Sequence, residues 1–269
     1  MPTVLITGTS SGIGLAACEL FAGKGWRVLA GSRNPDASLY KGKSIEPVRL
    51  DVNDPENVES FFREYEKHKM PLDCVVNNAG WGVSLPFEDT KRQEVAEMFQ
   101  TNVFGLMEVT RHACRIMRHQ KRGIIISVAS IAGLVGSALY PIYVSTKFAV
   151  EGFSESLAHE MREMGVTVKI VEPGRVQTKF FDRAYAPIEM NRVSEPYKHL
   201  AERKLAQHVQ SVEHYATAEQ IAKVIFEAAT DGTKKLRYPV GADALEEIKE
   251  KRTLTDQEFF EKMHEKFVG

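Results

Sequence analysis

Short apolar runs rich in β-branched residues alternate with longer amphipathic segments along this chain, and this alternation restricts its fold more than any other feature. Strand-like runs are predicted at 3–7, 26–30, 45–50, 73–77, 124–128, 166–171 and 236–240, with helical segments between most of them. Strands that are apolar along their whole length bury both faces, so helices are expected on both sides of one parallel sheet. The sequence therefore predicts an α/β protein with a doubly wound, Rossmann-type parallel sheet of about seven strands, flanked by helices on both faces.

The length of the chain fits one domain of this class, and we expect residues 1–269 to form a single dinucleotide-binding domain. Segment 179–215 breaks the alternation, because it is rich in charge and carries no strand signal. We predict that it forms helices and loop over the active site. Residues 242–269 are predicted to be a C-terminal helical extension. In a doubly wound sheet, ligands bind beyond the carboxyl ends of the strands.

The composition narrows the class of partner. The chain has 35 basic and 36 acidic residues, so its net charge of -1 gives no field that favours nucleic acid or an anionic membrane. No apolar run reaches the roughly 18 residues of a membrane span. The three cysteines and eight histidines lack metal-ligand spacing, and the cysteines suit a reducing compartment. We therefore expect a cytoplasmic protein that binds a small molecule and no metal.

A glycine-rich loop connects the first predicted strand to the first helix. Thr7 is followed by Gly8, Gly12 and Gly14 in the pattern T-G-x-x-x-G-x-G. Glycines let the backbone turn tightly and approach a pyrophosphate, whose negative charge is stabilised at the N-terminus of a helix. The loop therefore predicts a bound dinucleotide.

The residues at the end of the second predicted strand bear on which dinucleotide is bound. NAD-binding proteins usually carry an acidic residue there, whereas an arginine accommodates the 2′-phosphate of NADP. Here Ser32 occupies that place and Arg33 follows it. NADP(H) is therefore favoured, and NAD(H) stays the alternative if Arg33 is an ordinary surface residue.

Tyr143 and Lys147 lie four residues apart in a predicted helix, so they project from the same face about one turn from each other. An unperturbed phenol has a pKa of about 10, and a nearby ammonium favours its ionised form, which suits proton exchange near neutral pH. Ser130 comes just after a predicted strand. Its hydroxyl is expected to hold a carbonyl oxygen and stabilise it as it gains charge.

Together these motifs resemble the classical short-chain dehydrogenases/reductases. The resemblance runs from residue 3 to about 178 and includes an N-N-A-G element at 77–80 and a P-G-x-V-x-T element at 173–178. It implies a catalytic set of Asn102, Ser130, Tyr143 and Lys147, in which Asn102 interrupts a long helix and holds a water beside the lysine. The residues that it implies for cofactor binding are Gly8, Ser10, Ser11, Gly12, Ile13, Gly14, Ser32, Arg33, Asp51, Val52, Asn78, Ala79, Gly80, Tyr143, Lys147, Pro173, Gly174, Val176 and Thr178.

Within the family, the segment K-F-A-V-E-G at 147–152 is most similar to the steroid- and retinol-dehydrogenase-like branch. The family's members assemble through helices that here begin near Arg92 and Tyr143, so the resemblance implies a homodimer or homotetramer. Apolar residues near the predicted site favour a hydrophobic substrate, with core or subunit packing as the other interpretation. They are Ile131, Leu134, Val135, Leu139, Pro141, Ile142, Phe180, Phe181 and Tyr185.

The predicted function is that of an NADP(H)-dependent oxidoreductase, which interconverts a hydrophobic ketone or aldehyde and its alcohol by hydride transfer, with Tyr143 as general acid and base. One alternative is an NAD-dependent alcohol or hydroxysteroid dehydrogenase. A second alternative is a non-catalytic protein that senses NADP(H). The acid-base set at 143–147 argues against the second alternative, because a binding protein needs the glycine loop alone.

Overall fold

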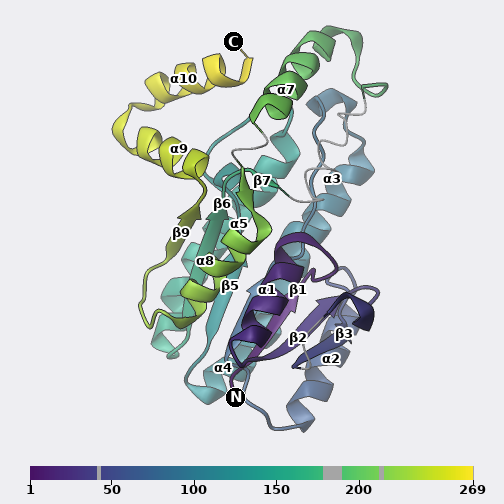
Figure 1. Ribbon diagram of the computed structural model, residues 1–269, viewed down its shortest axis with the longest axis vertical. Helices are drawn as coiled ribbons and strands as arrows, with labels where there is room; N and C mark the ends of the chain where they lie inside the picture. Colours follow the sequence, from purple (N-terminus) through teal and green to yellow (C-terminus); the bar gives the residue numbers. More distant parts are fainter. Residues whose placement is uncertain (41–43, 178–189, 212–214, 269) are drawn as a thin grey trace.

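Parallel strands form the centre of the molecule (Figure 1), and each of the six strand pairs in the main sheet runs parallel. The computed structural model describes residues 1–40, 44–177, 190–211 and 215–268. The sheet has seven strands in the order β3-β2-β1-β4-β5-β6-β9, which confirms the predicted doubly wound parallel sheet. The strands are β1 (Thr3–Thr7), β2 (Arg27–Ser32), β3 (Ile45–Arg49), β4 (Cys74–Asn77), β5 (Ile124–Val128), β6 (Thr167–Pro173) and β9 (Arg237–Val240).

Helices cover both faces of this sheet because successive residues of each strand point to opposite sides. Val4 and Ile6 pack in one core cluster with residues of α1 (Gly12–Gly23) and α8 (Ala218–Thr230). Leu5, between them, packs in a second cluster with residues of the helices on the opposite face. Those helices are α2 (Pro55–Lys67), α4 (Leu106–Gln120) and α5 (Pro141–Glu163).

The order of the strands places a crevice at one edge of the sheet. From β1 the chain builds outward through β2 and β3, then crosses back to β4 on the other side of β1. The connections that follow β1 and β4 therefore diverge at the carboxyl ends of these strands, where ligands bind in sheets of this kind. A second, two-stranded sheet pairs β7 (Val176–Gln177) with β8 (Ala216–Thr217).

Several element boundaries differ from the sequence prediction by one or two residues. Strand β2 extends through Gly31 and Ser32, which pair with residues of β3, although glycine and serine carry little strand signal of their own. Strand β6 likewise continues to Pro173. The helix predicted from about 92 to 120 is interrupted around Asn102, in agreement with what the resemblance implied, and consists of α3 (Arg92–Phe99), a π-helical segment η3 (Gln100–Gly105) and α4.

Segment 179–215 lies partly outside the described residues. Its described part contains a 3-10 turn, η5 (Glu195–Tyr197), and the helix α7 (Lys198–Ser211). Short 3-10 turns also occur at η1 (Ala37–Leu39), η2 (Phe87–Asp89) and η4 (Ile131–Gly133).

The C-terminal part of the chain forms two helices, α9 (Ala242–Thr253) and α10 (Asp256–Val268), seen at the upper left of Figure 1. Met263 and Phe267 of α10 pack with Ile131 and Val135, which follow β5. This contact brings the end of the chain to the carboxyl edge of the sheet. No helix among the described residues is both long enough and apolar enough to cross a membrane.

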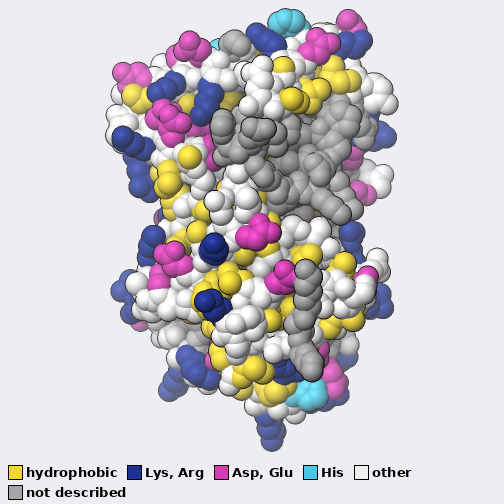
Figure 2. All heavy atoms as spheres, in the orientation of Figure 1, with side chains coloured by type: hydrophobic (Ala, Val, Ile, Leu, Met, Phe, Trp, Pro, Cys, Tyr) yellow, Lys and Arg dark blue, Asp and Glu magenta, His cyan; other side chains and the backbone are white. Residues whose placement is uncertain are grey.

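Charged side chains of both signs are interspersed on the face of the molecule shown in Figure 2. This mixture agrees with the net charge of -1.

Candidate active site

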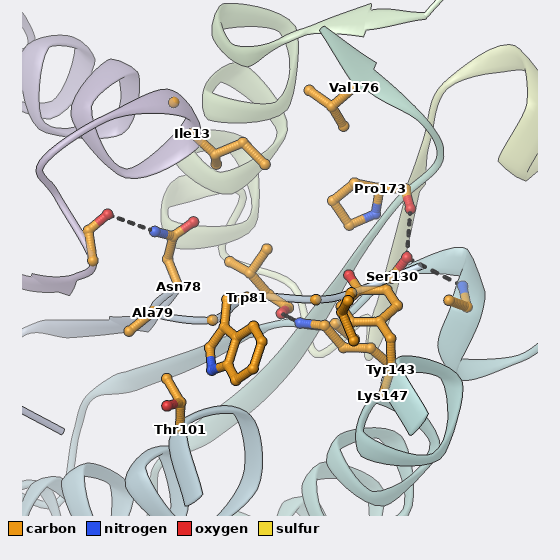
Figure 3. Close-up of a pocket in the computed structure, with 18 of the residues that line it drawn as sticks. Ile13, Asn78, Ala79, Trp81, Thr101, Ser130, Tyr143, Lys147, Pro173 and Val176 are labelled. Carbon is orange, nitrogen blue, oxygen red and sulfur yellow. Dashed lines mark hydrogen bonds between the residues drawn. The ribbon is translucent and has the colours of Figure 1, made fainter. Parts of the chain in front are cut away.

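A cavity of about 910 Å³ opens at the carboxyl ends of the strands. This volume is at the upper end of the range for small-molecule sites. Figure 3 shows Ile13 and Asn78 on one side of it, with Ser130, Tyr143 and Lys147 on the other. The predicted residues that line it are Gly8, Ser10, Ser11, Gly12, Ile13, Ser32, Arg33, Asp51, Val52, Asn78, Ala79, Gly80, Ser130, Tyr143, Lys147, Pro173, Gly174 and Val176.

The glycine loop leaves no room for side chains where the chain turns from β1 into α1. Gly8 has a φ of +72°, which favours glycine, and a Cβ on it would lie 2.7 Å from the Cα of Ala79. A Cβ on Gly14 would lie 2.3 Å from the carbonyl oxygen of Gly8. Gly14 therefore lies behind the loop and packs the helix against it, as expected of the last glycine in such a motif.

Thr7 and Asn78 connect the ends of β1 and β4 below the cavity. The Thr7 hydroxyl accepts hydrogen bonds from the backbone N–H groups of Asn78 and Ala79, both at 3.0 Å. In return, Nδ2 of Asn78 donates to the carbonyl oxygens of Thr7 at 3.0 Å and Gly8 at 3.1 Å. These bonds hold the glycine loop and the N-N-A-G element in one fixed arrangement.

The residues at the end of β2 fit the adenosine half of NADP(H). Ser32 and the exposed Arg33 both line the cavity. The Oγ of Ser32 is buried and has no hydrogen-bond partner among the described residues, which is costly unless a ligand supplies one. The glycines also leave space for a ligand beside the N-terminus of α1. The residues present therefore fit a dinucleotide.

Ser130, Tyr143 and Lys147 converge on the cavity from two elements. Ser130 caps the short turn η4, accepting a hydrogen bond from the N–H of Ala132 at 3.1 Å, and its hydroxyl donates to the carbonyl of Pro173 at 3.3 Å. Tyr143 and Lys147 come from the first two turns of α5, and Nζ of Lys147 lies 5.7 Å from the centre of the Tyr143 ring. The predicted face of this helix is therefore the one that meets the cavity.

Lys147 is held in a buried position. It is 7% exposed, and its Nζ donates a hydrogen bond of 2.8 Å to the carbonyl of Val128 at the end of β5. Burial lowers the pKa of this ammonium to about 8, and the carboxylate of Glu151, one turn further along α5, acts against the decrease. The charge on Lys147 thus responds to its surroundings near physiological pH.

Asn102 does not line the cavity but lies behind it in the π-helical segment η3, with 1% of its surface exposed. Its Nδ2 donates to the carbonyl of Trp81 at 2.8 Å and to the hydroxyl of Thr146 at 3.1 Å, while its Oδ1 accepts from the N–H of Trp81 at 3.0 Å. The side chain of Asn102 therefore connects the strand β4 loop to the helix α5. Single π-turns inside α-helices occur frequently at functional sites.

Several lining residues were not singled out from the sequence. Trp81 and Gly82 directly follow the N-N-A-G element, so their position in the sequence could have indicated that they line the cavity. A Cβ on Gly82 would lie 2.9 Å from the Tyr143 ring, so glycine lets the tyrosine lie against this loop. Phe267 of α10 also lines the cavity, and no local sequence pattern predicts this position. Charged side chains contribute as well: Glu94, Glu97, Arg175, Arg192 and Glu247.

The predicted apolar wall is present only in part. Ile131 and Val135 line the cavity, whereas the lining does not include Leu134, Leu139, Pro141 or Ile142. Leu134 and Leu139 pack in hydrophobic clusters, in agreement with the other interpretation of these residues. Four predicted residues lie outside the described residues: Thr178, Phe180, Phe181 and Tyr185. In the described ranges, no three His, Cys, Asp or Glu side chains are grouped so that they could hold a metal ion.

Comparison with known proteins agrees with this geometry. The family model of the short chain dehydrogenases matches residues 2–188. The chain belongs to this family. An uncharacterised oxidoreductase of Schizosaccharomyces pombe is 38% identical over 238 residues, covering 86% of this chain and 96% of the relative. The uncharacterised oxidoreductase YusZ of Bacillus subtilis is 33% identical over 248 residues, covering 88% of each chain.

A solved structure of ElxO with NADP bound is also similar to this short-chain dehydrogenase. It has a TM-score of 0.77 and 26% identity, covering 91% of this chain and 99% of that one. This short-chain dehydrogenase is therefore an oxidoreductase of CH–OH and C=O groups, as predicted. The resemblance to the steroid and retinol branch is not reflected in the names of these three relatives, so it stays a prediction.

Proposed function

We propose that this short-chain dehydrogenase reduces a hydrophobic ketone or aldehyde with NADPH, and catalyses the reverse oxidation, using Tyr143 as general acid and base. The observation that carries the proposal is the convergence of Tyr143, Lys147 and Ser130 at one cavity with the glycine loop. A protein that only binds the cofactor has no need of an acid, a cation and a hydroxyl in this arrangement.

The proposed cofactor is NADP(H). Its phosphates would be held by the backbone of the glycine loop and the N-terminus of α1, and its 2′-phosphate by Ser32 and Arg33. When bound, NADPH supplies the hydride for the carbonyl carbon. Support comes from the unpartnered Ser32 hydroxyl and from ElxO, a relative solved with NADP bound.

In the proposed reduction, the substrate oxygen accepts hydrogen bonds from the hydroxyls of Ser130 and Tyr143. Ser130 stabilises the charge that develops on this oxygen, and Tyr143 donates its proton to it. The ammonium of Lys147, close beside the Tyr143 ring, stabilises the phenolate that remains. Asn102 holds the backbone of Trp81 and the start of α5, and so positions these groups.

The substrate is proposed to be apolar around its carbonyl group. Ile131, Val135 and Phe267 line the cavity beside Ser130, together with the ring of Trp81. Four of the charged lining residues pair within the protein, Arg192 with Glu94 at 2.6 Å and Arg175 with Glu247 at 3.4 Å, which leaves less of their charge for a ligand.

Assembly and location are part of the same proposal. We propose a homodimer or homotetramer formed through the helices that begin near Arg92 and Tyr143, supported by the exposed rings of Phe104 and Phe148 on η3 and α5. We propose a cytoplasmic location because all three cysteines are free thiols.

Replacement of Tyr143 by Phe tests the mechanism. We expect carbonyl reduction to fall by about 10²-fold to 10⁴-fold or more, because the general acid is lost. NADPH affinity, measured by cofactor fluorescence, is expected to stay nearly unchanged. Tyr140→Phe is the matched comparison, since Tyr140 also lines the cavity with its ring 6.0 Å from that of Tyr143. It should cost much less activity. Full activity of Tyr143→Phe against a panel of ketones and aldehydes would refute the mechanism.

Arg33→Ala tests the cofactor. The variant should lose affinity for NADPH and keep its affinity for NADH, since only NADPH carries the 2′-phosphate. A parallel loss for both cofactors would contradict the assigned role of Arg33.

A further inference from the structure

A cluster of charged side chains lies next to Lys147 and outside the cavity lining. We call it the Glu151 cluster, and its members are Glu151 and Glu155 of α5, Glu172 of β6 and Arg237 of β9. Glu151 follows Lys147 by one turn of α5, and Glu172 immediately precedes Pro173, whose carbonyl accepts the Ser130 hydrogen bond. The cluster therefore adjoins α5, which carries Tyr143 and Lys147, and the strand end whose carbonyl accepts the hydrogen bond of Ser130.

The cluster has fewer hydrogen-bond donors than its carboxylates require. Nε of Arg237 carries one hydrogen, which it donates to Oε2 of Glu151 at 3.1 Å. Oε1 of Glu172 lies 3.3 Å from the same nitrogen but receives no hydrogen bond from it. Nη2 of Arg237 donates to Oε2 of Glu155 at 2.6 Å. Two carboxyl groups thus compete for one N–H.

Both competing groups are removed from water. Glu151 is 4% exposed and Glu172 is 1% exposed. Oε1 of each is buried without a hydrogen-bond partner among the described residues. Two buried carboxylates beside one another cannot both stay ionised at low cost, so a proton held by one of them relieves the repulsion. Glu155 differs, because its side chain is 51% exposed and water solvates it.

Burial outweighs the neighbouring cations at both carboxyl groups. Burial raises the pKa of Glu151 to about 7, against the opposing effects of Arg237 and Lys147, while Glu155 adds to the increase. Burial likewise raises the pKa of Glu172 to about 7, with a further increase from Glu151 and decreases from Arg237 and Arg252 of α9. His159 of α5 is a further titratable neighbour, which acts on Glu155.

We propose that Glu151 and Glu172 are positioning residues that hold one proton between them, and that release of this proton strengthens their support of the positive charge on Lys147. When the proton sits on Glu172, Glu151 is ionised and stabilises the ammonium one turn away. When it sits on Glu151, that support is lost. The proton exchanges with water, so no other reactant is required. The proposal rests on the proposed function, in which the ammonium of Lys147 stabilises the Tyr143 phenolate.

A purely structural ion pair would connect β9 to α5 without affecting Lys147. The two roles differ in their effect on Lys147. Both carboxyls are ionised in the pH range where the lysine titrates. Glu151→Gln removes the carboxylate nearest Lys147 and should lower the pKa of the lysine most, and Glu172→Gln, which removes the more distant charge, should lower it less. A structural role predicts no such graded decrease.

Two measurements on the unliganded protein test the shared proton and its effect. Infrared spectroscopy should detect the carbonyl band of a protonated carboxyl at about pH 6, which disappears as pH rises through about 7. The band should be lost in Glu151→Gln and in Glu172→Gln but kept in Glu155→Gln. Nuclear magnetic resonance of carbon-13-labelled lysine, assigned with Lys147→Gln, should show the Lys147 pKa lowered by about 0.5 to 1 unit in Glu151→Gln and by less in Glu172→Gln. Glu155→Gln should shift it little.

The alkaline limit of kcat/KM for carbonyl reduction should move with the lysine. It is expected at lower pH in Glu151→Gln and, by a smaller amount, in Glu172→Gln. Absence of the carboxyl band from the wild-type protein overturns the proposal, as does a lysine pKa that stays unchanged in Glu151→Gln, and the first result needs no variant to fold. An inactive protein that shows the band and the graded lysine shifts would refute the proposed function and leave the shared proton established.

Discussion

Two buried charged clusters share the strands β6 and β9, yet they differ in how completely their polar groups are paired. The Lys169 cluster consists of Lys169 of β6, Tyr238 of β9 and Asp231 after α8. Lys169 and Glu172 are three residues apart in β6, so their side chains lie on opposite faces of the sheet. One cluster therefore packs toward α8 and the other toward α5.

In the Lys169 cluster every polar side chain has a partner. Nζ of Lys169, which is 1% exposed, donates to Oδ1 of Asp231 at 2.5 Å and to the Tyr238 hydroxyl at 2.9 Å. That hydroxyl donates to Oδ2 of Asp231 at 2.6 Å. The partners hold the pKa of Asp231 well below its usual range despite the opposing effect of burial. A complete network of this kind resists protonation and serves stability.

In the Glu151 cluster, two buried carboxylate oxygens have no hydrogen-bond donor among the described residues. This difference has a functional consequence. A carboxyl group without a donor takes up a proton near neutral pH, so its charge can change while the fold persists. Beside Lys147, such a group changes the charge around the proposed site. Far from the site, the same group would only reduce stability. The comparison teaches that incomplete pairing of buried charges is tolerated next to the site.

Lys169→Met should have the largest effect on stability. It leaves Asp231 and the Tyr238 hydroxyl without their buried cation, and we expect a loss of about 3 kcal/mol in the free energy of unfolding. Urea denaturation measures this loss. Lys262→Met, which removes an exposed ion pair with Glu250, is the control and should change stability little. Equal losses in the two variants would show that the Lys169 network is not stabilising.

The Glu151 cluster should make the free energy of unfolding depend on pH. This effect is expected to be smaller than the loss caused by Lys169→Met. The pKa of Glu151 and of Glu172 rises from 4.5 in the unfolded chain to about 7 in the folded protein. The folded state therefore binds protons more tightly in this window, and the free energy of unfolding falls as pH rises from about 4.5 to about 7.

The double variant Glu151→Gln with Glu172→Gln should lack this decrease. We expect the wild type to lose on the order of 2 kcal/mol relative to the double variant across the window. Urea denaturation at a series of pH values provides the test. Parallel curves for the two proteins would mean that these carboxyls titrate alike in the folded and unfolded states.

Arg237→Lys should produce the smallest of the three effects. The ammonium keeps the positive charge but cannot donate to Glu151 and Glu155 at once through a fixed planar fork. A loss of about 1 kcal/mol is expected from thermal or urea unfolding. Glu155→Gln, whose carboxylate is half exposed, should cost less than this. If Arg237→Lys costs nothing, the bidentate contact contributes nothing to the cluster.

Most of the fold and of the proposed site could be predicted because the information is local. The alternation of apolar strands and amphipathic helices specifies a parallel sheet covered on both faces, and the right-handed crossover rule limits the topologies that such a sheet can take. The glycine spacing from Gly8 to Gly14 and the one-turn spacing of Tyr143 and Lys147 are properties of a few consecutive residues. Such patterns produce the same local geometry wherever they occur in a chain.

The remaining features depend on residues that the fold brings together from distant parts of the chain. Phe267 reaches the cavity only because α10 packs on the turn after β5. Asn102 connects Trp81 to Thr146 through contacts that no local pattern predicts. These features need the positions of several elements at once.

The sequence by itself determined the layers of the sheet, the dinucleotide loop and the face of the helix that carries Tyr143 and Lys147. Only the tertiary structure decided what surrounds Lys147, since Glu151, Glu172 and Arg237 come from three elements separated by up to 86 residues. The physical reason is that hydrogen-bond spacing and side-chain periodicity act over a few residues, whereas burial and the field of neighbouring charges depend on every element packed around a group.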